Sequence, residues 1–274
     1  MVASAGASGG AAAARLAERV GRGVEQGLAE FGYGAALLGE CLYWLALGRR
    51  RSQPVRLAPI AAEMLEIGVR AVPIVAVLAA TIGAMLAIQG IDTLRTFGAE
   101  SQVVIGIALS VSREFAPVIT GILVAGRSGS ALAARLGTMT INQEIDALRV
   151  MGINPVRFLA VPALVAMLVM LPCLTVLADF VGLLGAGIYV SLDLGMSLAA
   201  YADRVRDVLE TGDLLHGLYK SGLFAVLITI IGVANGARVA GGAEGVGRAT
   251  TRSVVQSISA IVVADMIVAF LLTR

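Results

Sequence analysis

Two adjacent charges, Arg113 and Glu114, lie in the stretch SREFAPVIT, whose flanking segments are otherwise apolar. A charge at the centre of a bilayer costs about 2.5–3.5 kcal/mol even on mild scales, so such residues are expected to face protein or a wet cavity. Neighbouring residues project about 100° apart on a helix, so the two charges cannot face the same way. We expect Glu114 to line a cavity, on one face with Ser110, Pro117 and Gly121, and Arg113 to face another helix or an acidic neighbour. Pro117 should also bend the helix, because it frees the carbonyl of Arg113.

Lys220 is the only lysine of the chain, and it stands at the start of another apolar segment, 221–240. A compact ammonium group can contact a lipid phosphate or pair with Glu114. The alternative is that the side chain snorkels to the membrane surface, which is common near helix ends. Two further charges inside apolar segments, Asp179 and Asp265, are expected to be structural partners of other charges, for example of an arginine.

The composition indicates a membrane protein. The 274 residues are 58% hydrophobic and 15% charged, with a mean hydropathy of +0.87, whereas soluble domains carry about 25% charged residues. The glycine-rich segments lack a Walker-type lysine and no basic run is interleaved with aromatics, so neither a nucleotide-hydrolysing P-loop nor a nucleic-acid-binding surface is predicted. Cys41 and Cys173 are isolated and His216 is the only histidine, which favours two buried free thiols over a zinc or thiol site. The predicted fold class is all-α, a polytopic helical membrane protein.

Five apolar segments are candidate membrane spans: 71–91, 103–125, 158–192, 221–240 and 253–272. The third has 35 residues, which would reach about 50 Å as one helix, beyond a hydrocarbon core of about 30 Å. It is therefore either one long tilted helix or two short spans. A cytoplasmic N-terminus places 15 arginines inside and four outside for five spans and for six spans alike. The stretch ADFVGLLGAGIYV contains no polar turn, which favours five.

The sequence divides into three parts. Residues 1–14 are low-complexity and are expected to form a disordered tail. Residues 15–55 repeat apolar side chains at steps of three and four, which predicts an amphipathic helix that lies in the cytoplasmic headgroup region, packs against the protein, or does both. Residues 56–274 form the membrane domain. Within it, residues 126–155 predict a helical cytoplasmic loop that ends at Asn154-Pro155. Its apolar residues either dock a soluble partner or lie on the membrane: Leu136, Met139, Ile145, Leu148 and Met151.

Three segments resemble the MlaE/YrbE permeases, the membrane subunits of ABC-type lipid transporters that work with MCE proteins: EFAPVITGILVAGRSGSALAARLGTM, EIDALRVMGINPVRFLAVP and GVGRATTRSVVQSI. The resemblance runs from about residue 15 to the end. It implies an N-terminal interfacial helix, five transmembrane helices and a homodimer in the bacterial inner membrane. It also implies a cytoplasmic ATPase subunit that holds ATP and Mg²⁺, often a small STAS-domain protein, and an MCE-domain protein on the periplasmic side.

The resemblance also assigns roles to residues. Lipid, usually a glycerophospholipid, would pass through a cavity at the dimer centre, and residues 127–152 would couple the chain to the ATPase. The chain itself would hold no cofactor and catalyse no reaction. The expected coupling residues are Glu144, Asp146, Leu148, Arg149, Met151 and Gly152, and the expected substrate-binding residues are Glu114, Arg113, Lys220, Gln89, Ile91, Ser110 and Pro117.

Three alternatives stay open at this point. A permease of the same family could carry sterols or other lipids. A membrane-embedded lipid-modifying enzyme would need a nucleophile and a base that converge, and His216 has no evident nucleophile partner in the sequence. A scaffold or an ion channel is the third. Copurification of an ATPase subunit would separate a transport subunit from the other classes.

Overall fold

The computed structural model describes residues 5–47 and 57–272, and all the regular elements in these residues are helices. Five segments of the described chain are long and apolar enough to cross a membrane: Leu57–Arg95, Glu100–Ile141, Val156–Leu194, Thr211–Gly236 and Gly242–Leu271. The predicted all-α class with five spans is confirmed. For the third predicted segment, 158–192, the sequence allowed either one long helix or two short spans. The structure contains a single long helix there, α8 (Val161–Leu194), which continues through Pro172.

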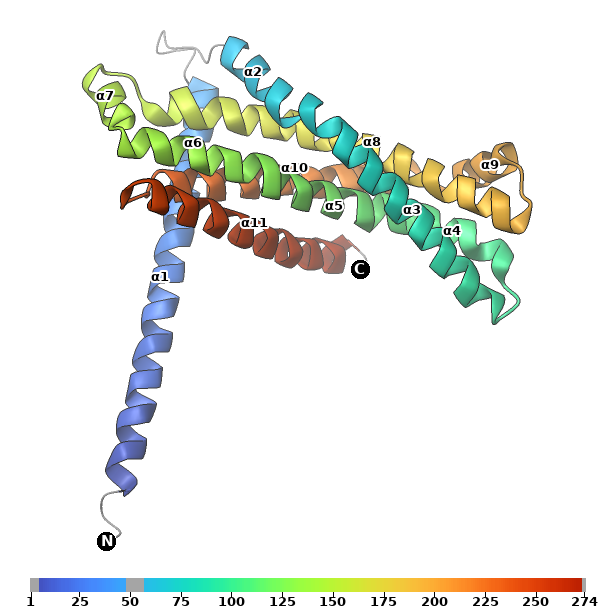
Figure 1. The fold of residues 1–274 in the computed structure, drawn as a ribbon, viewed down its shortest axis with the longest axis horizontal. Coiled ribbons are helices and arrows are strands. Elements are labelled where there is room, and N and C mark those ends of the chain that lie inside the picture. The colour runs from blue at the N-terminus through green and yellow to red at the C-terminus, as the bar shows by residue number, and fades with distance from the viewer. Residues whose placement is uncertain (1–4, 48–56, 273–274) are drawn as a thin grey trace.

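The spans pack lengthwise into one bundle (Figure 1). The helix α8 lies against α3 (Val72–Arg95), α2 (Leu57–Ile67), α5 (Ala116–Val124) and α10 (Thr211–Gly236), and α10 also lies against α6 (Ser130–Ile141) and α11 (Gly242–Leu272). In the most apolar 18-residue stretch of the first span and of the fifth span, only 28% and 17% of the residues are buried. The corresponding share is 50–56% in the other three spans. The helices α3 and α11 therefore leave most of their apolar surface for lipid or for another chain.

The two ends of the bundle carry different elements. The short helix α7 (Glu144–Val150) and the α10–α11 connection lie at one end. The helix α9 (Leu198–Val208) and the connection between α3 and α4 (Val103–Ser110) lie at the other (Figure 1). The arginine distribution predicts that the α7 end is cytoplasmic, so we call it the inner end and the α9 end the outer end. The amphipathic helix α9 follows a cap by Ser197, whose hydroxyl accepts a hydrogen bond from the Ala200 amide at 3.2 Å. The sequence pattern did not predict this helix.

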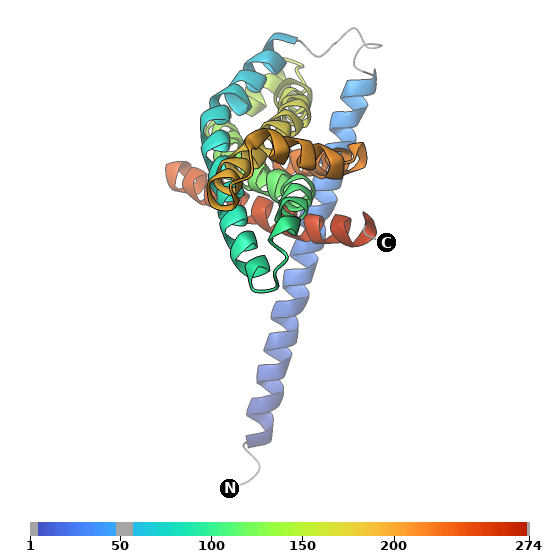
Figure 2. The same ribbon diagram turned by 90° about the vertical axis from the view of Figure 1, so that its right-hand side faces the viewer.

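The helix α1 (Ala5–Leu47) crosses the spans near the inner end and passes along one side of the bundle (Figures 1 and 2). A helix in the headgroup layer must cross transmembrane spans in this way. Residues 5–14 are helical, which differs from the predicted disordered tail, and their alanine content explains the difference because alanine has the highest helix propensity. Residues 1–4 of the predicted tail and residues 48–56, with the arginine triplet at 49–51, lie outside the described residues.

The C-terminal part of α1 is anchored to the bundle. Leu37 and Cys41 are buried in a cluster with residues of α8 and α10, and the Asn154 amide donates a hydrogen bond to the Glu40 carboxylate at 2.8 Å. Burial raises the pKa of the Cys41 thiol to about 12. Cys41 is thus buried as predicted, whereas the same prediction is wrong for Cys173, which is exposed on α8.

Candidate functional site

A π-helical turn interrupts the second span at the two adjacent charges. The span runs through α4 (Val103–Ser110), the turn η3 (Val111–Phe115), α5, a second π-helical turn η4 (Ala125–Gly129) and α6. The amide of Ala116 bonds to the carbonyl of Val111, five residues earlier. Pro117 follows directly and has no amide hydrogen, so a wider turn accommodates the missing helical bond. The helix is therefore wider beside the two charges, in the region where the sequence predicts a bend caused by Pro117.

Lys220 joins three spans through its ammonium group. Its Nζ atom lies 2.5 Å from Oε2 of Glu114, in η3, and 2.8 Å from Oδ1 of Asp265, in α11. The Lys220 side chain is completely buried, so it does not snorkel to the surface. The sequence suggests two roles for Lys220, contact with a lipid phosphate or pairing with Glu114. The structure contains the pairing with Glu114. Asp265 also has a partner, as expected, but the partner is a lysine and not an arginine.

Arg113 points away from this cluster. Its guanidinium binds the Asp213 carboxylate in the first turn of α10, with Nη2 2.5 Å and Nε 2.7 Å from Oδ1. Asp213 also caps α10, because its other carboxylate oxygen accepts a hydrogen bond from the Glu210 amide at 3.0 Å. The prediction that Arg113 turns toward an acidic neighbour on another helix is confirmed.

The charge cluster, defined here as Lys220, Glu114 and Asp265, is accessible mainly through one member. The Glu114 side chain is 41% exposed, that of Asp265 is 20% exposed and that of Lys220 is 0% exposed. One ammonium group faces two carboxylates, so the cluster carries an excess of acidic groups inside an apolar bundle. Such a cluster can hold three spans in register, and its accessible carboxylate can bind a polar or cationic group of a ligand.

Other predicted substrate-binding residues do not line an open surface in this chain. Pro117 and Gly121 are buried on the α10 side, and a side chain at Gly121 would meet the Phe224 ring at 3.0 Å. The expectation of one cavity-lining face fails because the π-helical turn adds a residue and rotates the following helix relative to Glu114. Ile91 is also buried, in the main core.

The remaining two predicted substrate residues are accessible to different degrees. Ser110 is partly exposed at the end of α4, one turn before the charge cluster begins. Gln89 is exposed on α3. Within the described part of the chain, the structure does not join Gln89 to the charge cluster by a hydrogen bond or an ion pair.

The predicted coupling residues gather at the inner end. The second span continues through α6 to Ile141, so residues 127–152 do not form a separate loop helix; the chain turns at Gln143, which has a φ of 60°, and α7 follows. Gly152 ends α7 with a φ of 74°, and the next amide, of Ile153, bonds to the Leu148 carbonyl at 2.9 Å. Gly152 is thus a C-terminal glycine cap of α7, because glycine adopts the left-handed conformation without strain.

The surface of α7 combines charge and apolar area. Asp146 and Arg149 form an exposed ion pair with 2.9 Å between Oδ1 and Nη1, and Glu144 is exposed beside them. Val150 and Met151 are 89% and 64% exposed, whereas Leu148 is buried and holds α7 in place. Leu148 is therefore a packing residue in this chain and is not free to contact a partner.

Comparison with known proteins identifies the family. The sequence profile described as Permease MlaE matches residues 60–271. The chain belongs to the MlaE permease family. The match covers the five spans except for the first three residues of the first, together with the charge cluster and α7, so the site described above lies wholly within the permease domain.

Individual relatives of this permease come from bacteria and a plant. A probable ABC transporter permease protein of Rickettsia felis is 35% identical over 215 residues, which are 78% of this chain and 83% of the relative. The intermembrane phospholipid transport system permease protein MlaE of Haemophilus influenzae is 33% identical over 75% of this chain and 79% of its own length. The chloroplastic protein trigalactosyldiacylglycerol 1 of Arabidopsis thaliana is 36% identical over 68% of this chain and 53% of its own length.

The sequence does not indicate one acidic member of the permease site, Asp213. This residue lies outside the predicted fourth span, which begins at 221, because α10 starts ten residues earlier, at Thr211. The sequence does indicate Asp265, as a charge inside an apolar segment, but it does not show which distant residue pairs with it. Among the described residues, no group of three or more His, Cys, Asp or Glu side chains could hold a metal ion.

Proposed function

We propose that this permease is the membrane subunit of an ATP-driven ABC-type transporter that moves phospholipid between the inner membrane and a conduit of MCE-domain protein. The observation that carries the proposal is the charge cluster. A fully buried lysine with two carboxylates inside an apolar bundle is expensive to maintain, and intramembrane charges of this kind mark substrate pathways. The half-exposed Glu114 carboxylate would contact the polar headgroup while the surrounding apolar surface accommodates the acyl chains.

The proposed assembly follows from where surfaces are left uncovered. The apolar faces of α3 and α11 would pack against a second copy and against lipid, which supports a homodimer. The exposed face of α7 would bind an ATPase subunit at the cytoplasmic side of the membrane, and ATP and Mg²⁺ would be held there and not in this chain. An MCE-domain protein would contact the outer end, and a STAS-domain protein would accompany the ATPase.

Replacing Glu114 with alanine should lower ATP-driven phospholipid transport by roughly tenfold or more, since a hydrogen bond to a charged group contributes about 1.5–3 kcal/mol. Dimer assembly should be unchanged, because Lys220 keeps Asp265 as its partner. The measurement is transfer of fluorescent phospholipid by the complex reconstituted in vesicles. Glu66→Ala removes an exposed carboxylate that pairs with Arg70 and, at 3.8 Å, with Arg127, and serves as the matched control. Normal transport by dimeric Glu114→Ala protein would contradict the proposal.

Replacing Val150 and Met151 together with aspartate should lower the amount of ATPase subunit that copurifies with the permease by about tenfold or more. Burying one large apolar side chain contributes about 1.5–3 kcal/mol, and the change removes two such contacts. Leu192→Asp is the control. Leu192 is 81% exposed near the outer end of α8, far from α7, so its substitution should not affect binding of the ATPase. Equal copurification of the ATPase with both variants would show that α7 is not the coupling surface.

A further inference from the structure

A groove of about 1040 Å³ lies between α1, α10 and α11. None of the three residues of the charge cluster lines it, and α1, which crosses the bundle, forms one of its walls. Its walls come from three helices: residues 27–38 of α1, residues 226–235 of α10, and residues 245–267 of α11, together with the α10–α11 connection. Groove and cluster are thus two separate features of the permease.

The groove is charged at its inner end and apolar toward the outer end. Both α10 and α11 show the same change along their length, although they run in opposite directions. The inner part is lined by Arg238, Arg248 and Arg252, and the outer part by Val226, Leu227, Val263 and Ile267. Fifteen residues separate Arg252 from Ile267, or about 22 Å of helix, which matches one leaflet of a bilayer about 40–45 Å thick.

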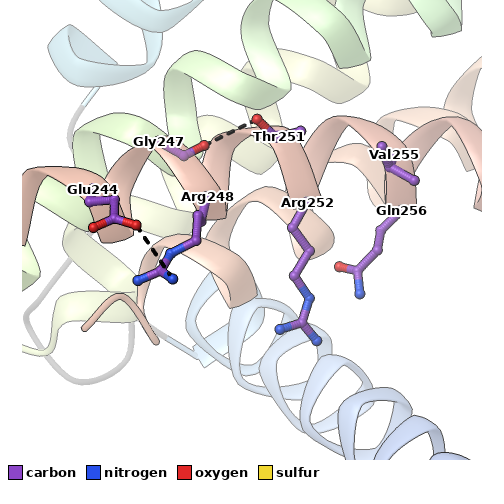
Figure 3. Close-up of a pocket in the computed structure, with 7 residues that line it drawn as sticks. All are labelled: Glu244, Gly247, Arg248, Thr251, Arg252, Val255 and Gln256. Carbon is purple, nitrogen blue, oxygen red and sulfur yellow. Dashed lines mark hydrogen bonds and ion pairs between the residues drawn. The ribbon is translucent and has the colours of Figure 1, made fainter. Parts of the chain in front are cut away.

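A polar network closes the inner part of the groove and connects its three helices. The Glu30 carboxylate of α1 accepts hydrogen bonds from Arg252 and, at 3.1 Å, from Nε2 of Gln256. The Oε1 atom of Gln256 in turn accepts a hydrogen bond from Asn235 of α10 at 2.8 Å. Figure 3 shows Arg252 and Gln256 leaving the same side of α11, the side where α1 lies. The groove therefore exists only while α1 is in place.

Two arginines remain available to a ligand. Arg248 contacts Glu244 at 3.6 Å, but both side chains are more than two-thirds exposed (Figure 3). The guanidinium of Arg238 lies 4.0 Å from the ring centre of Tyr33 and forms no ion pair with any side chain that the structure describes. Three arginines thus face two carboxylates, Glu30 and Glu244, so the inner part of the groove has an excess of positive charge that suits a phosphate group.

We propose that this groove binds an anionic phospholipid of the cytoplasmic leaflet. Its phosphate would lie at Arg238 and Arg248, and its acyl chains would follow Val263 and Ile267 toward the middle of the membrane. The bound lipid would fill the space between α1 and the bundle, and would thereby hold α1 against α10 and α11. This site is independent of the transport proposal, since it uses none of the residues of the charge cluster.

The test compares lipid binding to the purified full-length permease by native mass spectrometry. The probes are phosphatidylglycerol and phosphatidylcholine with the same acyl chains. The wild-type protein should prefer phosphatidylglycerol by roughly tenfold, and Arg238→Gln/Arg248→Gln should lose that preference. Arg204→Gln/Arg206→Gln removes two charges from α9 at the outer end and should keep it, as should Arg238→Lys/Arg248→Lys, which retains the charge.

A second measurement reports the position of α1 directly. In a Cys173→Ser background, alkylation of the buried Cys41 by a maleimide should be several-fold faster in phosphatidylcholine nanodiscs than in phosphatidylglycerol nanodiscs. The glutamine double variant should react at the faster rate in both lipids. This readout stays informative if the variants differ in detergent stability, because each protein is compared with itself in two bilayers.

Three results would overturn the proposal. The first is an unchanged preference for phosphatidylglycerol in Arg238→Gln/Arg248→Gln. The second is displacement of the lipid by millimolar inorganic phosphate, which would assign the arginines to a free anion. The third is that a photoreactive residue at Val263 forms crosslinks to a second copy of the chain and none to lipid. Glu114→Ala should keep the phosphatidylglycerol preference, so a failure of the transport proposal can be told apart from a failure of this one.

Discussion

Replacing Lys220 with methionine should lower the free energy of unfolding of the permease by about 3 kcal/mol, the lower end of the cost of removing one partner from a buried ion pair. The lysine has no exposed surface, and its loss leaves the carboxylates of Glu114 and Asp265 facing each other without a cation. We place the effect at the lower end because the Glu114 side chain is 41% exposed and water can reach it. Equilibrium unfolding in mixed detergent micelles measures the change, and phospholipid transport should fall at least tenfold with it.

A triple variant separates stability from function at the same site. Lys220→Met, Glu114→Met and Asp265→Leu together remove all three charges and keep the side-chain volumes similar. Replacing a complete buried ion cluster with well-packed apolar residues of similar volume is often neutral or stabilising. The triple variant should therefore unfold like the wild type and still fail to transport phospholipid. Transport at the wild-type rate would show that the charges only connect the spans.

Burial costs explain why much of this fold can be predicted from the sequence. A backbone in hydrocarbon must satisfy its hydrogen bonds internally, so each apolar segment of sufficient length predicts a helix, and the described residues contain five such helices. The same cost makes Glu114, Lys220 and Asp265 conspicuous, because each is a charge in an apolar context. Charge counting could not decide between five and six spans, whereas the continuous helix α8 does.

Local backbone geometry is what the sequence pattern could not supply. A regular helix of 3.6 residues per turn places Glu114 and Pro117 on one face, but the π-helical turn at 111–115 changes that register, and Pro117 is buried. The same limitation applies to Ile91, whose side chain is buried in the core while Gln89, two residues earlier, is exposed. Periodicity alone does not say which side of a helix a neighbouring helix will cover.

The fifth span connects the two sites that we infer. The outer part of α11 contributes Asp265 to the charge cluster, and its inner part contributes Arg248 and Arg252 to the groove beside α1. A rigid helix can transmit displacement between such sites, because packed elements move as units. A lipid that holds α1 against α11 would therefore also restrain the helix that carries one carboxylate of the cluster.

Gly83→Ala should destabilise the permease by about 1–3 kcal/mol, the usual cost of overpacking a closely packed core. The helices α3 and α8 approach each other closely at Gly83 and Gly182. A Cβ atom at Gly83 would lie 2.7 Å from the carbonyl carbon of Gly182 and 3.0 Å from its Cα. These are backbone atoms, which cannot rotate away as a flexible side chain would, so the two helices must separate.

Gly106→Ala should stabilise the permease, whereas Gly83→Ala should destabilise it, and this contrast makes Gly106→Ala the matched control. Gly106 lies inside α4, and among the described residues no atom beyond its own helix lies within 4 Å of an added Cβ. In that setting alanine favours the helix by up to about 1 kcal/mol over glycine. Equilibrium unfolding of the two variants should shift in opposite directions from the wild type. If Gly83→Ala were as stable as Gly106→Ala, α3 and α8 would not be in backbone contact, and the arrangement of the first and third spans would have to be revised.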